Sequence, residues 1–239
     1  MTDRTGIEVT QACVTRDGVR IFDGLSLSMR ERRVGVVGRN GSGKSTLLRL
    51  IAGLQPLEAG AVRVDGVDVL RDRAAAIRRV GILFQNPDHQ IIFPTVEEEL
   101  AFGLRQLGLG RAAAGAQAHA VLTEHGVADW ATRRTHELSH GQKHLLCLLS
   151  VLAMAPGVVL LDEPFTGLDI PTTMRLRARL DGLAQQVVLS THDPALLEGF
   201  DRVIWLEDGR VVDDGPAVPL LQRFTARMRR MGLDGTCLP

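Results

Sequence analysis

Residues 38 to 46 read Gly38-Arg39-Asn40-Gly41-Ser42-Gly43-Lys44-Ser45-Thr46, and they lie between two apolar segments, 34–37 and 47–52. The spacing matches the pattern Gly, four residues, Gly, Lys, then Ser or Thr. Glycines let backbone N–H groups wrap a polyphosphate, and the positive end of the following helix favours an anion. The order strand, glycine-rich loop, helix therefore predicts a phosphate-binding P-loop and not an ordinary glycine turn.

Two side chains of this loop carry chemistry of their own. We expect Lys44 to reach the β- and γ-phosphates of a bound nucleotide, because it is the cation of this motif. We expect Ser45 to offer its hydroxyl to Mg²⁺. The loop therefore predicts a polyphosphate and Mg²⁺ as ligands, with every residue of 38–46 in the binding site.

The composition sets limits on the class of protein. Lys and Arg together number 28, as do Asp and Glu, so the formal net charge is zero and no global field favours nucleic acid or a membrane surface. A hydrophobic content of 45% is enough for the core of one large α/β domain. Cys13, Cys147 and Cys237 fit no metal or disulfide spacing, and no apolar signal stretch begins the sequence. We therefore expect a protein of a reducing compartment that does not bind nucleic acid.

The pattern along the chain predicts an α/β fold in which a helical segment interrupts a P-loop core. Alternating apolar and polar residues predict antiparallel β structure at 7–29. Residues 86 to about 155 are alanine-rich and helical in pattern, whereas 158–162 is an apolar parallel strand that ends in acid. We expect a RecA-like P-loop core with an N-terminal antiparallel β subdomain and an inserted helical subdomain, all within one domain of residues 1–239. The other predicted elements are β segments at 61–69, 80–84 and 187–190, a hairpin at 203–212, a helix with Thr95 as its N-cap, helices beginning near Gly141 and at Pro171, and helices over 111–125 and 217–231.

Asp162 and Glu163 end the apolar strand at 158–162. Downstream of a P-loop, Asp162 is placed to bind Mg²⁺ directly or through water. Glu163 is the candidate general base, because a carboxylate near the γ-phosphate can take a proton from the attacking water. The alternative, an acidic turn at the end of a strand, would be favoured only without the P-loop.

The stretch Leu138-Ser139-His140-Gly141-Gln142 precedes a long predicted helix. Ser139 is suited to cap that helix, and the amides that follow it can bind an anion. Taken alone, the stretch indicates no more than a capped helix start.

The order of these motifs along the chain resembles the nucleotide-binding domain of ABC transporters. The P-loop is followed by Gln85, 138–142, the Leu-Leu-Asp-Glu-Pro stretch at 160–164, Gly167-Leu168-Asp169 and then His192. The resemblance covers nearly the whole chain and identifies the fold as that of an ABC ATPase, with the helical signature subdomain at about 86–155. It implies a catalytic role for three residues, Glu163, His192 and Gln85, and Mg²⁺ contacts from Ser45, Gln85 and Asp162. It implies γ-phosphate binding across two subunits by Ser139, His140, Gly141 and Gln142, with Asp169 as the D-loop acid.

The resemblance also implies partners. In such a family one copy supplies the P-loop, Asp162 and Glu163, while a second copy supplies Ser139, so ATP bridges a head-to-tail dimer. Binding of ATP then closes two subunits, and cleavage of the β–γ bond removes the bridge.

The segment Phe84-Gln85-Asn86-Pro87-Asp88-His89-Gln90 and its continuation to Gly103 resemble the A component of energy-coupling-factor (ECF) importers of vitamins and transition-metal ions. In that family the segment docks the membrane T component, which works with a substrate-binding S component, and Gln90 would lie in the docking groove. The chain would then act at the cytoplasmic face of the membrane. The short chain and the Glu31-Arg32-Arg33 stretch are most similar to biotin-transporting members, and cobalt-transporting members are the alternative.

Two departures from the family pattern stand out. The sequence has no tyrosine. Roughly where the family has an aromatic residue that stacks on adenine, this sequence has Arg16. A guanidinium can stack on adenine, so Arg16, Phe22 or no residue fills this role. His140 replaces a common glycine of the signature, which bears on the hydrolysis rate.

Two other functions are open to this sequence. A soluble ABC ATPase that acts on ribosomes or DNA usually carries two nucleotide domains or long coiled-coil insertions, which this chain lacks. A nucleotide switch without hydrolysis would not need the intact Glu163 and His192.

Overall fold

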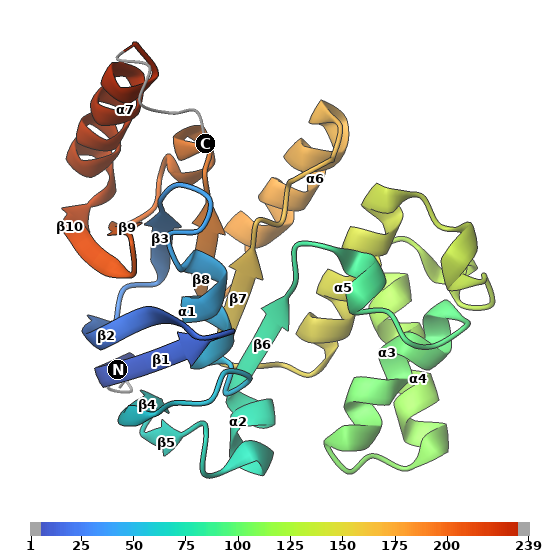
Figure 1. Ribbon diagram of the computed structural model, residues 1–239. Coiled ribbons are helices and arrows are strands. Elements are labelled where there is room, and N and C mark those ends of the chain that lie inside the picture. The colour runs from blue at the N-terminus through green and yellow to red at the C-terminus, as the bar shows by residue number, and fades with distance from the viewer. Residues whose placement is uncertain (1–5, 234–239) are drawn as a thin grey trace. The chain divides into compact units, whose positions relative to one another are not determined.

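The computed structural model describes residues 6–233, so Cys237 lies outside the described residues. The chain has an α/β fold and divides into two compact units (Figure 1). We call residues 6–76 with 186–233 the P-loop unit, and residues 77–185 the signature unit. Helix α2 (Arg73–Arg79) lies where the chain passes from the first unit to the second.

The P-loop unit begins with an antiparallel sheet, as the alternating sequence at 7–29 predicts. Its strands are β1 (Ile7–Arg16), β2 (Val19–Met29), β4 (Ala59–Val64) and β5 (Val67–Asp68), in the order β2-β1-β4-β5. Apolar side chains of the strands are buried on one face, which is the period-2 pattern of a half-buried sheet. The predicted β segment at 61–69 is therefore confirmed as parts of β4 and β5.

A second sheet in the same unit holds the P-loop. Strands β10 (Arg210–Pro216), β9 (Arg202–Glu207), β3 (Arg33–Val37) and β8 (Gln186–Thr191) are neighbours in that order. Strand β3 is parallel to both β8 and β9, and β9 and β10 form the predicted antiparallel hairpin. Helix α1 (Lys44–Ile51) follows the P-loop, the short helix η4 (Pro194–Leu197) follows β8, and α7 (Ala217–Leu233) ends the described chain.

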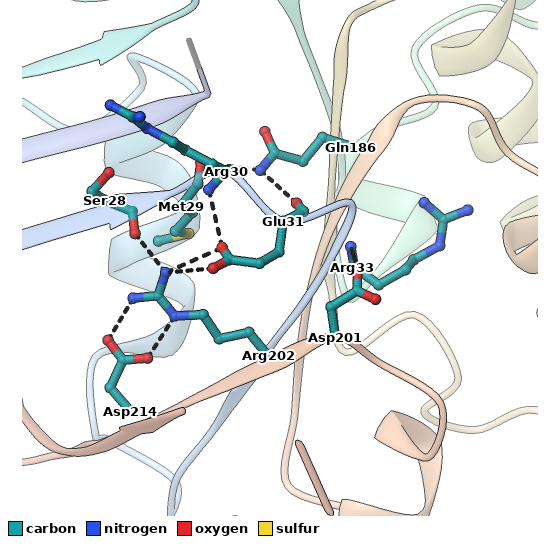
Figure 2. A network of polar contacts seen from close by, with 9 residues as sticks. All are labelled: Ser28, Met29, Arg30, Glu31, Arg33, Gln186, Asp201, Arg202 and Asp214. Atoms are coloured by element: carbon teal, nitrogen blue, oxygen red, sulfur yellow. Dashed lines mark hydrogen bonds and ion pairs between the residues drawn. The ribbon is translucent and has the colours of Figure 1, made fainter. Parts of the chain in front are cut away.

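Polar contacts around Arg202 join the two sheets of the P-loop unit (Figure 2). Its guanidinium makes a bidentate pair with Asp214 at 2.6 Å for both bonds, and it donates to the carbonyl of Ser28 at 2.8 Å. The same guanidinium lies 3.1 Å from the carboxylate of Glu31. Gln186 donates to the carbonyls of Met29 and Glu31. The end of β2 is thereby attached to the strands that carry the P-loop.

Glu31 is, with Asp214, one of the two carboxylates that pair with Arg202 in this network. Burial raises the pKa of its carboxyl, but backbone N–H groups of Glu31 and Arg30 and the charge of Arg202 outweigh burial and lower the pKa below the ordinary value. The carboxylate therefore stabilises the folded state above the ordinary pKa of a glutamate.

The signature unit contains two parallel strands and a helical core. Strands β6 (Val80–Leu83) and β7 (Val158–Asp162) pair with Leu83 opposite Leu161. The helices are α3 (Val96–Gln106), α4 (Arg111–Glu124), α5 (His140–Ala153) and α6 (Ile170–Asp181), with short turns η1 (Pro87–His89), η2 (Ala128–Trp130) and η3 (Thr135–Glu137). Helices α3, α4 and α5 share one buried apolar cluster, as their sequence pattern predicts.

Local capping signals decide where these helices begin. Thr95 accepts from the backbone N–H of Glu98 and donates to its carboxylate, so the predicted start of α3 is confirmed. The predicted start at Pro171 is wrong by one residue. The Asp169 side chain accepts from the N–H of Thr172, so α6 begins at Ile170 and Pro171 takes the second helical position.

The signature unit also contains β6, β7 and α6, so it extends beyond the helical subdomain of about 86–155, whose limits stay a prediction. Among the described residues, no helix is long and apolar enough to cross a membrane.

We expect Arg202→Met to lower the free energy of unfolding by about 2 kcal/mol at pH 7, because acceptors around a half-buried guanidinium lose their charged donor. Urea unfolding of the full chain measures this loss. The loss should shrink as the pH falls from the ordinary pKa of a glutamate through the lowered pKa of Glu31, because the protonated carboxyl no longer attracts the guanidinium. As a control, Arg223→Met removes a more exposed pair with Asp213 and should cost less than about 1 kcal/mol. Equal losses in the two variants would contradict the role of the network.

Candidate active site

Hydrogen bonds within the P-loop hold its conformation at the end of β3. Lys44 donates from Nζ to the carbonyl oxygens of Gly38 at 2.8 Å and Arg39 at 3.1 Å, and its side chain is only 6% exposed. Gly43 occupies the N-cap of α1 with φ +102°, and no side chain of the described residues caps the helix there. The positive end of α1 is therefore not covered by a capping side chain, as an anion site requires.

The loop packs closely against its own chain at Gly38. A Cβ at Gly38 would lie 2.2 Å from the carbonyl oxygen of Leu206 and 2.5 Å from Oγ of Ser42, so only glycine fits. The buried Oγ of Ser42 has no hydrogen-bond partner within the described chain. An anion in the loop can satisfy such a hydroxyl. The predicted residues 38–46 thus form a cradle suited to phosphate.

Phe22 lies beneath this cradle. Its side chain is fully buried, and its Cε1 would be 3.0 Å from a Cβ at Gly43. Phe22 therefore supports the loop and does not serve as the adenine-stacking aromatic. Arg16 ends β1 with an exposed side chain whose Nε lies 3.5 Å from Asp17. Stacking of Arg16 on adenine stays a prediction.

His192 lies at the same sheet edge as the P-loop. Strands β3 and β8 are parallel, with Val37 opposite Thr191, so Gly38 and His192 follow neighbouring strand ends. The turn after His192 is held by Asp193, whose N–H donates to Oγ1 of Thr191 at 3.1 Å. The carboxyl ends of parallel strands are the usual place for ligands in an α/β sheet.

Gln85, Asp162 and Glu163 gather at the corresponding edge in the signature unit. Because Leu83 pairs with Leu161, Gln85 and Glu163 leave neighbouring strands at similar heights. Asp162 is 2% and Glu163 7% exposed, whereas Gln85 is exposed. Glu163 has φ +48°, a conformation that costs a non-glycine residue free energy and that often occurs at functional sites.

No three His, Cys, Asp or Glu side chains of residues 6–233 form a group that could hold a metal by themselves. Mg²⁺ usually keeps water and phosphate oxygens and takes only one or two protein ligands. The hydroxyl of Ser45, the amide oxygen of Gln85 and the carboxylate of Asp162 are each of a type that Mg²⁺ accepts, and their binding of one ion stays a prediction.

The segment after Gln85 is held by side chains of its own chain. The amide oxygen of Gln90 accepts from the N–H of Phe84 at 3.1 Å, and its nitrogen donates to the carbonyl of Ile82 at 3.4 Å. Glu99 accepts from the N–H groups of Ile92 and Phe93, both at 2.9 Å. Burial raises the pKa of Glu99 despite these two hydrogen bonds.

Sequence reasoning missed Glu99, although a signal existed. Its position falls on the apolar stripe of α3 with Val96 and Leu100, where a charge predicts a buried partner. The side chain of Gln90 is hydrogen-bonded to the backbone of β6 and of Phe84, which follows β6. Its docking role stays a prediction.

The signature begins α5 through a reciprocal cap. Ser139 accepts from the N–H of Gln142 at 3.3 Å, and the Gln142 side chain accepts from the N–H of Ser139 at 2.9 Å. Asp169 caps α6 from the facing loop, and the hydrogen bonds from Thr172 lower the pKa of its carboxyl. The structure thus brings the signature and Asp169 to one cavity of about 660 Å³ in the signature unit.

Residues outside the predicted site line the same cavity. Arg179 lies 2.6 Å from Nδ1 of His125 and donates to the carbonyl of His125 at 3.3 Å. Burial, followed by the charge of Arg179, lowers the pKa of His125. No motif in the sequence marks this pair, because Arg179 lies in α6 and His125 directly follows α4, 54 residues earlier in the chain.

Comparison with known proteins identifies the family. Residues 22–166 match the family model described as "ABC transporter". The chain is 55% identical to the biotin transport ATP-binding protein BioM of Rhodobacter capsulatus, over 97% of this chain and 99% of that one. It is 40% identical to the nickel import ATP-binding protein NikO of the same organism, over 92% and 93%.

A solved structure of cbiO1 from Clostridium perfringens, part of the ABC transporter complex cbiONQ, has a TM-score of 0.77 and 25% identity. It covers 97% of this chain and 96% of its own. The chain therefore belongs to the ABC transporter family and is an ABC-type ATPase with the P-loop NTPase fold.

Proposed function

We propose that this chain is the ATP-binding and ATP-hydrolysing subunit of an ECF-type importer, and that the imported solute is biotin. The observation that carries the ATP-binding part of this proposal is the P-loop. A glycine cradle, a helix end without a capping side chain and the inward Lys44 together suit the phosphates of ATP.

The proposed roles of the residues follow from their chemistry. Lys44 would bind the β- and γ-phosphates. Ser45, Gln85 and Asp162 would hold Mg²⁺, which would supply positive charge to the phosphates. Glu163 accepts the proton of the water that attacks the γ-phosphorus, and the P–O bond to the leaving ADP breaks.

Two further groups act around the transferred phosphoryl group. His192 holds the γ-phosphate from the edge of the P-loop unit. The signature of a second copy, with Ser139 and the N–H groups at the start of α5, binds the same γ-phosphate, so that ATP bridges two chains. We assign Asp169 to the D-loop, where its side chain caps the start of α6.

The transport assignment rests on the relatives. Similarity to the R. capsulatus biotin protein extends over almost the full length of both chains and exceeds that to the nickel protein, 55% against 40%. The chain would work at the cytoplasmic face of the membrane with a T component and an S component, and the S component would recognise the solute. The nickel relative supports a transition-metal ion, such as nickel or cobalt, as the second candidate solute.

We expect Lys44→Ala to weaken ATP binding at least tenfold, because the phosphates lose their direct cation. Isothermal titration calorimetry with a non-hydrolysable ATP analogue measures the affinity. Lys143→Ala is the matched control, since Lys143 is paired with Asp88 at 2.6 Å outside the P-loop. Unchanged affinity of the Lys44 variant would contradict the P-loop assignment.

Glu163→Gln should retain ATP binding and lower kcat for hydrolysis by about 10²-fold or more, because the attacking water loses its base. The variant should also accumulate an ATP-bound dimer, visible by light scattering after size exclusion. Glu124→Gln, on the exposed end of α4, should leave both properties unchanged. Hydrolysis at the wild-type rate in the Glu163 variant would remove it as the base.

Replacement of BioM by this chain in R. capsulatus should retain uptake of radiolabelled biotin, and replacement by its Glu163→Gln variant should not. Nickel uptake is measured in R. capsulatus cells in which this chain replaces NikO. Support of nickel uptake without biotin uptake would favour the transition-metal assignment and overturn the biotin assignment.

A further inference from the structure

His144 is a buried polar side chain that the proposed chemistry does not use. It lies on α5 with no exposed surface, and neither Nδ1 nor Nε2 has a hydrogen-bond partner among residues 6–233. Burial, and then the charge of His140, lowers the pKa of His144 to about 4, so the ring is neutral at neutral pH. A leucine would fill this place without leaving polar atoms unsatisfied, so the histidine needs another reason.

The ring of His144 packs against the ring of His140. Their centroids are 4.7 Å apart and their planes meet at 71°, which is an edge-to-face arrangement. The two residues are four apart on α5, so their side chains lie on the same face of the helix. This packing sets the orientation of the His140 ring, and His140 is the first residue of α5 after the Ser139 cap.

The His140 ring also approaches the loop that leads to α6. A Cβ at Gly167 would lie 3.4 Å from Nε2 and 3.6 Å from Cδ2 of His140, so the ring covers the backbone of Gly167. Gly167 has φ +77°, which places it at a tight bend. A second close approach joins the same segments, because a Cβ at Gly141 would lie 2.8 Å from Cγ2 of Thr172.

Two consecutive turns connect Gly167 to Glu163. The N–H of Thr166 donates to the carbonyl of Glu163, and the N–H of Leu168 donates to the carbonyl of Phe165, both at 3.2 Å. Glu163 itself has a left-handed backbone conformation, which neighbouring contacts must maintain. The backbone at Gly167 is therefore linked to the backbone of Glu163 through these two turns.

We propose that His144 is a positioning residue: it fixes the ring of His140, which holds the turn at Gly167 and thereby the carboxylate of Glu163. His144 touches neither substrate nor nucleotide, and its effect passes through two contacts within one chain. The inference rests on the proposed function, in which Glu163 is the base and residues 139–142 bind phosphate. It adds a link by which the start of α5 and the catalytic turn move together.

A double-mutant cycle on the purified full chain tests the link. His144→Leu should lower kcat for ATP hydrolysis about tenfold, change KM less than about twofold, and leave Tm unchanged or raised. His144→Phe should retain most of kcat, because it keeps an aromatic ring against His140. In the His140→Gly background, His144→Leu should change kcat less than about twofold, since the intermediate ring is gone.

Two controls separate positioning from stability. His119→Leu, an exposed histidine on α4, should leave kcat unchanged. If His144→Leu does not fold, His144→Met removes the ring at similar volume and completes the same cycle.

An unchanged kcat in the folded His144 variant would overturn the proposal. If His144→Leu lowered kcat by the same factor with and without the His140 ring, that result would also overturn the proposal. Absence of hydrolysis by the unmutated chain would instead contradict the proposed function and this inference together, which distinguishes the two failures.

Discussion

The close approach of the backbone at the end of β3 constrains the rest of the P-loop unit. Only a residue without a Cβ fits at Gly38 against Leu206 and Ser42, and the buried ring of Phe22 supports the loop from below Gly43. Both neighbours of β3 run parallel to it and are buried with it, so the strand end cannot shift without breaking two ladders. The loop is thereby preorganised for phosphate, and a nucleotide meets less reorganisation on binding.

Capping side chains fix where the helices at the site begin. Ser139 caps α5, Asp169 caps α6 and Asp193 caps the short helix after β8. Each cap satisfies backbone N–H groups that would otherwise lack partners, and each fixes where neighbouring functional groups lie. In the proposed mechanism, Ser139 and Asp169 therefore serve both folding and chemistry, so a stretch that alone indicates only a helix start can also belong to an active site.

The elements predicted correctly from the sequence are those with local signals. The P-loop, the cap at Thr95 and the hairpin at 203–212 each depend on residues within a few positions of one another. What the sequence could not supply depends on contacts between distant segments. Burial of Phe22 under the P-loop and packing of His140 on Gly167 arise only when separate strands and helices assemble. Glu99 is an intermediate case. Its position on the apolar stripe of α3 indicates that it is buried, but the sequence does not identify the N–H groups from which it accepts hydrogen bonds.

The central claim is that each ATP is hydrolysed by two copies of the chain, and mixing two inactive variants tests it most directly. Lys44→Ala removes the phosphate cation, and Ser139→Asp keeps a helix cap but places a carboxylate where phosphate would bind. Each variant alone should be inactive. A heterodimer of the two has one site with both lesions and one site intact, so an equal mixture should recover about a quarter of wild-type ATPase activity by random pairing. Activity no higher than the sum of the separate variants would contradict the shared site.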